Sequence, residues 1–599
     1  MEDPTNQYPS SRTVAETVSA GLDSAPPKPQ RVIDAPDWIR VCAALPLWQP
    51  LARIAAGKSS PLLWGTGALD ADLAQRLAKI YRACQAERWK KDLAAELQQF
   101  LQREVDSAQV PDSQAREAVA WAYLLPAISQ TAAPVAEQLL GRLLEFVDAA
   151  LANANPVTQL LAKVELALVL AHFAPDARLA TSLRKGAIGA EARLAGALLD
   201  PFGLPMQHVG ELLRPWLATL VRAHELLRGG ETQFSDTGRE RLERLARHVL
   251  RLSRPDGGSI LQTAAGTTAD REFLTAAVLS TTSTPAIAAL ALGKGTTDKK
   301  TPKGMPVAPL YSPKAAIAVL RDRWGAPQTQ ATVNFSGPQV WLEVSRGNQS
   351  LLHGEWCASV QVNDVAATPL GPWTEVCWHS DADCDYLEIE QKLSGGWLLQ
   401  RHVLLARQDE CLLLADSLLD ETTRTPAEFL ATAGQAPQLA YSASWQLAPG
   451  VHFVPQAETR EGHLQVGRKP LGLVLPLALP EWRKQPVTGE LSVQNELLQH
   501  RLQTRGRNLF APVWIDLNPN RFKGAPCTWR QLTIGESLQI QPREVAVGYR
   551  VQVRFAQWLL YRSLAWRGNR TVLGKNYATD FACCRFHPNG ETKDILEVQ

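Results

Sequence analysis

Two side chains that could carry acid–base chemistry stand three residues apart, His208 and Glu211. At the start of a helix, this spacing lets both side chains point the same way. Such a pair could act as a base or neutralise a negative charge, with Gln207 and Arg214 completing the cluster. The alternative is an exposed helix N-terminus, where a glutamate is favourable for its interaction with the helix dipole alone.

Tyrosine can also transfer protons, and the Ala- and Leu-rich part of the chain offers Tyr81 and Tyr123. Tyr123 follows Trp121-Ala122 and is interpreted as a catalytic acid or base at the edge of a cleft. The alternative places it in a core, because aromatic residues at helical spacing are usually buried.

The segment from His379 to Tyr386 is dense in groups that could bind a cation. It contains alternating Asp381, Asp383 and Asp385, and a histidine with carboxylates could hold a divalent ion. We favour an acidic turn before a strand, so no metal ligand is assigned and the cofactor stays unknown. The sequence contains no Rossmann or P-loop motif, no HExxH and no GxSxG.

The elements that position these residues change in character near residue 300. Before that point, apolar residues recur at helical spacing between prolines. This pattern predicts helices at 69–87, 91–106, 114–130, 137–151, 158–173, 176–198, 212–221, 238–252 and 268–281. Their short connections make neighbouring helices antiparallel, which predicts an α/α barrel or solenoid.

The second half has the alternation that is typical of strands. Residues 386–392 alternate, the sequence Ser394-Gly395-Gly396 supplies a turn, and Trp397–Ala406 continues as a partner strand. Further strands are expected at 451–454, 463–466, 471–477, 491–495, 532–541 and 549–559. Many short strands with turns between them predict an antiparallel β-sandwich.

This order of halves resembles the heparinase II/III-like family of polysaccharide lyases. Residues 199–222 (LDPFGLPMQHVGELLRPWLATLVR) resemble the family's helix start with a histidine and a glutamate, and residues 386–419 resemble its early sandwich strands. The resemblance implies a multidomain α and β protein. Its expected parts are a disordered tail at 1–35, an incomplete α/α toroid of antiparallel helix pairs at 36–293, a linker at 294–328, and the β-sandwich at 329–599.

The resemblance also implies a chemistry, because members of this family cleave acidic polysaccharides by β-elimination. That reaction needs a neutralised uronate carboxylate, a base for the C5 proton and an acid for the leaving oxygen. We therefore expect an acidic polysaccharide or oligosaccharide as the partner, with His208, Glu211 and Tyr123 as catalytic residues. Gln207 and Arg214 are expected to bind the substrate.

In the sandwich half, Trp397, Arg401 and His402 are expected to contact the substrate as well. Sugars stack on indole rings, and several tryptophans crowd this part of the sequence: Trp356, Trp373 and Trp378. The alternative is a non-catalytic descendant that binds a carbohydrate or a protein. The paired histidines that the family's sandwich usually supplies are missing here, which favours this alternative.

Composition narrows the class of protein further. The 599 residues carry a net charge of +2, which gives no case for nucleic acid. No run of apolar residues is long enough to span a membrane. The nine cysteines are scattered and the first residues lack a signal-peptide pattern, so a cytoplasmic location is expected. No feature of the sequence sets the oligomeric state.

Overall fold

The computed structural model describes residues 35–44, 59–66, 70–86, 93–103, 110–149, 155–174, 176–228, 233–262, 264–282, 284–294, 302–423, 425–431, 436–587 and 589–599. The tail expected at 1–35 lies outside these residues, apart from Ala35. Contacts divide the chain into two compact units. The first comprises the residues up to Ala246 together with Leu279–Thr281, and the second comprises Arg247–Val278 and Thr282–Gln599. We call them the helical unit and the sheet unit.

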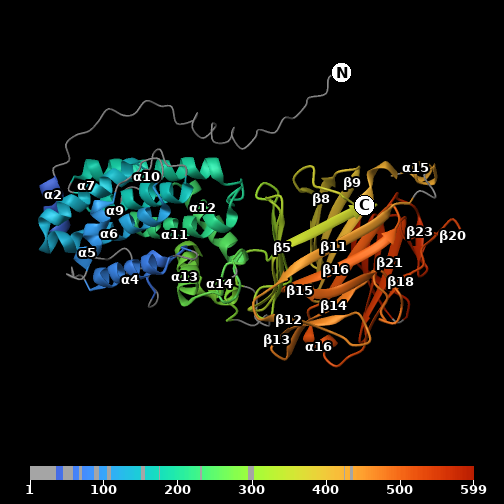
Figure 1. The fold of residues 1–599 in the computed structure, drawn as a ribbon. Coiled ribbons are helices and arrows are strands. Elements are labelled where there is room, and N and C mark those ends of the chain that lie inside the picture. The colour runs from blue at the N-terminus through green and yellow to red at the C-terminus, as the bar shows by residue number, and fades with distance from the viewer. Residues whose placement is uncertain are drawn as a thin grey trace, which may run out of the picture. The chain divides into compact units, whose positions relative to one another are not determined.

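The helices of the helical unit include all but one of those expected, and one, α2, that the sequence pattern does not predict (Figure 1). They are α2 (Ala35–Ala44), α4 (Ala71–Gln85), α5 (Ala94–Gln102), α6 (Asp112–Thr131), α7 (Ala133–Ala149), α8 (Pro156–Gln159), the π-helical turn η3 (Leu160–Leu166), α9 (Ala167–His172), α10 (Ala177–Leu198), α11 (Val209–Leu227) and most of α12 (Asp236–Arg251). Helix α6 contacts α2, α4, α7 and η3, which explains why its sequence is apolar almost all round.

The sheet unit contains four antiparallel sheets among its described residues. The nine-stranded sheet comprises β1 (Leu310–Ser312), β2 (Ile317–Arg321), β3 (Thr329–Asn334), β4 (Val340–Arg346), β5 (Gln349–Val362), β11 (Gln438–Leu447), β16 (Leu497–Arg505) and β15 (Gly489–Gln494) in that order, with β6 (Val365–Ala366) on β5. The eight-stranded sheet has the order β12 (Val451–Pro455), β13 (Gly462–Val466), β14 (Lys469–Pro476), β17 (Asn508–Asp516), β10 (Cys411–Asp420), β9 (Trp397–Ala406), β8 (Cys384–Leu393) and β7 (Thr374–Ser380).

Two smaller sheets follow in the sequence. The five-stranded sheet has the order β18 (Cys527–Leu532), β21 (Ala546–Val553), β22 (Ala556–Ser563), β25 (Phe581–Phe586) and β26 (Thr592–Val598). The four-stranded sheet has the order β20 (Gln539–Ile540), β19 (Gly535–Glu536), β23 (Arg570–Val572) and β24 (Lys575–Tyr577). Helices α13 (Thr268–Thr282), α14 (Pro285–Ala291), α15 (Pro426–Ala431) and α16 (Pro519–Phe522) complete the described elements longer than one turn.

The sheets begin earlier than the sequence indicated. Residues 294–328 were expected to form a linker, and 295–301 lie outside the described residues. Strands β1 and β2 nevertheless fall inside this segment and pair with each other and with β3. All five residues of β2 are buried. The Gly- and Pro-rich composition at 293–309 therefore marks a shorter connection than expected, and the first sheet starts at Leu310.

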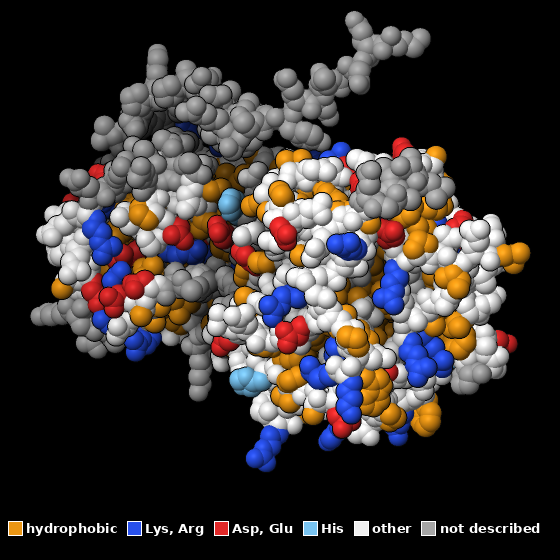
Figure 2. All heavy atoms as spheres, turned by 45° about the vertical axis from the view of Figure 1, so that its right-hand side comes forward, with side chains coloured by type: hydrophobic (Ala, Val, Ile, Leu, Met, Phe, Trp, Pro, Cys, Tyr) orange, Lys and Arg blue, Asp and Glu red, His pale blue; other side chains and the backbone are white. Residues whose placement is uncertain are grey.

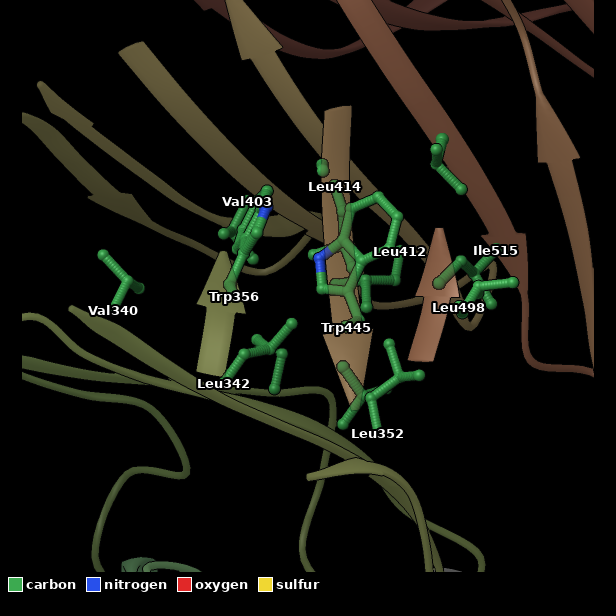
Figure 3. Packing of buried hydrophobic residues seen from close by; sticks show 14 of the residues in the cluster. Val340, Leu342, Leu352, Trp356, Val403, Leu412, Leu414, Trp445, Leu498 and Ile515 are labelled. Atoms are coloured by element: carbon green, nitrogen blue, oxygen red, sulfur yellow. The ribbon is translucent and has the colours of Figure 1, made fainter. Parts of the chain in front are cut away.

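The central strands of the eight-stranded sheet are buried on both faces, as the burial of every residue in β9 and β10 shows. One face packs on the nine-stranded sheet, where Trp356 and Trp445 lie among Val403, Leu412 and Leu414 (Figure 3). The other face packs on the five-stranded sheet through residues such as Tyr386, Leu404, Trp514 and Trp558. This double burial explains why β9 and β10 read as nearly continuous apolar runs.

The hairpin between β8 and β9 confirms the expected turn. Leu393 pairs with Trp397, so three residues connect the strands. Gly395 and Gly396 have φ angles of 80° and 77°, in the left-handed region that favours glycine. This turn fixes the register that places the polar residues of β8 and β9.

The sandwich core contains one histidine without a partner. His500 on β16 is fully buried between Leu498 and Leu502 on the same face of the strand, and neither ring nitrogen has a hydrogen-bond partner among the described residues. Burial lowers its pKa to about 4. The folded protein therefore holds His500 neutral under conditions where an unfolded chain would protonate it.

Replacing His500 with leucine should reduce the loss of stability at acid pH. The unfolded histidine has a pKa of about 6.5, so between this value and about 4 the unfolded state binds more protons and stability falls as the pH falls. The variant should gain up to about 3 kcal/mol relative to the native protein across that window. Urea unfolding at several pH values measures this difference. The exposed His452, changed to leucine, is the control, and a difference for His500→Leu that does not change with pH would contradict the prediction.

Candidate functional site

The expected His208–Glu211 pair lies on the surface of the helical unit at the start of α11. The side chains of His208 and Glu211 are 65% and 80% exposed, and Nδ1 lies 3.7 Å from Oε2. This distance is longer than a hydrogen bond, so a small side-chain rotation is needed to form one. His208 is the N-cap residue with φ 51° and ψ 40°, a backbone conformation that is uncommon outside glycine. The structure thus offers an accessible imidazole with a carboxylate beside it.

A short loop before α11 holds this pair in place. Asp200 is buried, and its Oδ1 accepts hydrogen bonds from the backbone N–H groups of Phe202 and Leu204, each at 2.8 Å. A β-bridge joins Leu199 to Pro205 across the loop. Asp200 is therefore the residue that shapes the approach to His208. Its position two residues before the first amide that it binds is the local signal for such a turn.

The other two expected members of this cluster, Gln207 and Arg214, differ in their exposure to solvent. Gln207 is exposed next to His208, whereas Arg214 is only 7% exposed on α11. Trp216, two residues after Arg214, is fully buried. The exposed cluster therefore comprises Gln207, His208 and Glu211, and Arg214 belongs to the helical core.

Tyr123 lies in the core of the helical unit beside a buried ion pair. The Nε and Nη2 atoms of Arg222 donate to the carboxylate of Glu165 at 2.5 and 2.7 Å, and Nη1 donates to the carbonyl of Pro61. Burial, and then the neighbouring Glu165 carboxylate, raise the pKa of Tyr123 well above its ordinary value. Tyr123 is thus buried and neutral, while the His208–Glu211 pair faces solvent. Local sequence could not show this, because Glu165 and Arg222 lie on η3 and α11, far apart in the chain.

In the sheet unit, strand alternation separates Arg401 from His402. Consecutive residues of a strand point to opposite faces of the sheet. Arg401 points into the core between the nine- and eight-stranded sheets, and His402 points toward the five-stranded sheet. The expectation that both contact one substrate is therefore not met by their placement. Trp397 is 6% exposed and packs in the sandwich core.

Arg401 contacts two indole rings in the sandwich core. Its guanidinium carbon lies 4.5 Å from the ring centre of Trp356 and 4.7 Å from that of Trp373. Nε donates to Asp416 at 3.1 Å and Nη1 donates to the carbonyl oxygen of Trp356 at 2.6 Å. Tyr441 donates to the second oxygen of Asp416. These contacts hold the guanidinium in one orientation at a pocket of about 230 Å³.

His402 belongs to a separate buried network. Its Nδ1 lies 2.9 Å from the hydroxyl oxygen of Tyr386, whose hydrogen is donated to Glu388. Its Nε2 lies 2.9 Å from the hydroxyl of Ser417. Burial, and then the nearby Arg562, lower the pKa of His402 well below its ordinary value. The imidazole is therefore neutral and hydrogen-bonded on both sides, as expected of a histidine that stabilises the core.

The acidic segment forms the turn between β7 and β8. Oδ1 of Asp381 accepts hydrogen bonds from the backbone N–H groups of Asp383 and Cys384, each at 2.8 Å. One atom each of His379, Asp381 and Cys384 lies within 4.8 Å of the others. The thiol of Cys384, however, donates to the carbonyl of Ile595. The turn is held by its own hydrogen bonds, as the preferred interpretation of this segment predicts.

Acidic and basic side chains are interspersed over the sheet unit on the face shown in Figure 2, so charges of one sign do not dominate this face. None of the described helices combines the length and apolar character that a membrane crossing requires.

Comparison with known proteins gives the fold its context. Neither a family profile nor any curated protein sequence matches the chain. A heparinase III structure has a TM-score of 0.56 at 10% identity and covers 93% of this chain and 98% of its own. A second heparinase III has a TM-score of 0.54 at 10% identity with the same coverage. The heparan sulfate lyase HepC from Pedobacter heparinus has a TM-score of 0.51 at 12% identity, and the match covers 94% of this chain and 91% of that one.

These similarities extend over almost the whole chain and bear out the expected order of an α/α toroid followed by an antiparallel β-sandwich. At 10–12% identity they establish the fold rather than the activity. The chain therefore has a polysaccharide lyase-like fold with a strongly divergent sequence.

Proposed function

We propose that the protein is a polysaccharide lyase that cleaves uronic-acid-containing polysaccharides or oligosaccharides by β-elimination. The observation that carries this proposal is the exposed His208–Glu211 pair at the start of α11, in a chain whose fold is shared with heparinase III and a heparan sulfate lyase. One of these neighbours is a heparan sulfate lyase, which supports an acidic glycan as the substrate.

The proposed roles follow from the proximity of Nδ1 of His208 to Oε2 of Glu211. If Glu211 accepts a hydrogen bond from Nδ1 of His208, the tautomer is fixed and Nε2 is left free to accept a proton. Nε2 would then remove the C5 proton of a uronate residue, and the bond from C4 to the glycosidic oxygen would break as the C4–C5 double bond forms. The leaving oxygen would take up a proton from the resulting His208 imidazolium or from water, which leaves an alcohol as the second product. Gln207, exposed beside His208, would bind the sugar.

Replacing His208 with alanine should lower lyase activity by about a hundredfold or more, the usual contribution of a positioned base. The measurement is the rise in ultraviolet absorbance of the conjugated unsaturated uronate, recorded with a panel of uronic-acid polysaccharides and oligosaccharides. His452→Ala is the matched control, since this histidine is exposed on β12 and takes no part in the proposed chemistry. Equal activity of the His208→Ala and His452→Ala variants would remove His208 from the mechanism.

A second candidate function is glycan binding without cleavage. The burial of Tyr123 favours it, because this placement withdraws the tyrosine expected to share the chemistry with His208. A folded native protein that binds members of the panel but produces no unsaturated uronate would support this alternative and contradict the lyase proposal.

A further inference from the structure

The pocket beside Arg401 has the chemistry of a binding site for a small organic anion. Most of its lining is apolar, with Trp356, Leu393 and Leu399 among its walls. Arg401 supplies the positive charge, and its Nη2 atom has no hydrogen-bond acceptor among the described residues. The guanidinium lies over the rings of Trp356 and Trp373, and its Nε and Nη1 atoms already donate hydrogen bonds, so a ligand would bind at the Nη2 edge. Edge-on approach is the geometry in which a carboxylate binds arginine.

The size of the pocket restricts what it can hold. Its volume of about 230 Å³ is below the range of roughly 300–1,000 Å³ that is typical of sites for drug-sized ligands. One ring of monosaccharide size fits this space. Trp373, which is 7% exposed, lines it and offers part of its indole to such a ring.

The pocket is distinct from the exposed pair on α11. All of its lining residues belong to the sheet unit, between residues 338 and 401, whereas His208 and Glu211 belong to the helical unit. Residues of β4, β5, β8 and β9 meet in it, so a ligand there would contact both large sheets. The ion pair with Asp416 keeps Arg401 in position without occupying Nη2.

We propose that this pocket binds the carboxylate of a single sugar acid, with Arg401 holding the carboxylate and the tryptophans contacting the ring. The choice of a uronate as the sugar acid rests on the proposed function; the preference for a cyclic carboxylate rests on the pocket alone. A free uronate has no glycosidic bond to eliminate, so its binding can be measured whether or not the protein is a lyase.

The test is a titration of the full-length protein with sodium glucuronate, followed by tryptophan fluorescence and calorimetry. Glucose, which lacks the charge, and acetate, which lacks the ring, should each bind about tenfold more weakly or not at all. Ala358→Phe fills the pocket from β5 and should abolish binding. Ser359→Phe adds a similar side chain on the opposite, exposed face of the same strand and should leave binding unchanged.

Ala367→Phe fills the pocket from the loop after β6 and serves if Ala358→Phe does not fold, as judged by circular dichroism. Loss of glucuronate binding in either folded variant, with retention in Ser359→Phe, supports the proposal. Absence of glucuronate binding to the native protein would overturn it. So would equal binding of glucose or acetate, or undiminished binding in a folded variant with the pocket filled.

Discussion

Replacing Glu165 with leucine should lower the free energy of unfolding of the helical unit by about 3–5 kcal/mol. Glu165 is completely buried, and its carboxylate accepts two hydrogen bonds from Arg222, which is itself only 2% exposed. The leucine side chain would leave a buried guanidinium without its counter-ion. The cost arises from this uncompensated charge more than from the loss of the pair's attraction, because forming a buried pair already requires both groups to lose their hydration.

Urea unfolding followed by far-ultraviolet circular dichroism measures the effect, since helices dominate that signal. Glu211→Leu is the control, because Glu211 is 80% exposed and its loss should cost less than about 1 kcal/mol. The double variant Glu165→Leu with Arg222→Met should regain most of the lost stability, since both charges are then removed. A loss for Glu165→Leu that is no larger than for Glu211→Leu would show that the pair is not desolvated as the structure indicates.

The helical half was largely predictable because its signals are local. Apolar spacing and prolines predicted the helices close to their observed ends, and α10 spans 177–198 where 176–198 was expected. The exposure of Glu211 follows from the same helical geometry, whereas His208 precedes the helix as its N-cap residue. The Glu165–Arg222 pair was not predictable, because its partners are 57 residues apart and the apolar spacing around each residue carries no information about the other. Tyr123 was assigned a role without knowledge of this pair beside it.

The sandwich half shows where the strand signals fail. Residues 549–559 were expected to form one strand, but β21 ends at Val553 and β22 begins at Ala556. Between these two strands Arg554 has a φ of 56°, in the left-handed region that reverses the chain. The strand expected at 532–541 is interrupted in the same way, because Ser537 and Leu538 have φ angles of 50° and 63°. Turns are usually recognised by glycine or asparagine at such positions, so the arginine, serine and leucine found here did not indicate a turn in the sequence.

The faces of β9 were unpredictable for a different reason. A strand with one buried face alternates polar and apolar residues, and this alternation shows which residues share a face. Both faces of β9 are buried, so its sequence (WLLQRHVLLA) carries no such alternation. Arg401 and His402 could therefore be assigned to one site in a hypothesis, although Arg401 forms an ion pair on one face and His402 joins a hydrogen-bond network on the other.

A second large effect is expected where the chain enters the sheet unit. Arg254 follows α12, and its Nη1 donates to both carboxylate oxygens of Glu343 on β4, at 2.8 and 3.1 Å. Its Nη2 donates to the carbonyls of Gln262 and Ala264, so the arginine joins the loop after α12 to the sheet. Both charged side chains are at most 4% exposed. Replacing Glu343 with leucine should therefore lower the free energy of unfolding by about 3–5 kcal/mol.

Tryptophan fluorescence during urea unfolding measures this loss, because twelve of the 18 tryptophans lie beyond residue 320. Glu490→Leu is the matched control. Glu490 also pairs with an arginine, Arg501 at 3.1 Å, but both side chains are about half exposed and the pair should contribute less than about 1 kcal/mol. Glu343→Gln keeps the shape and one acceptor oxygen without the charge. An intermediate loss in that variant would show that charge and hydrogen bonding both anchor the loop, whereas equal stability of Glu343→Leu and Glu490→Leu would show that Arg254 does not depend on Glu343.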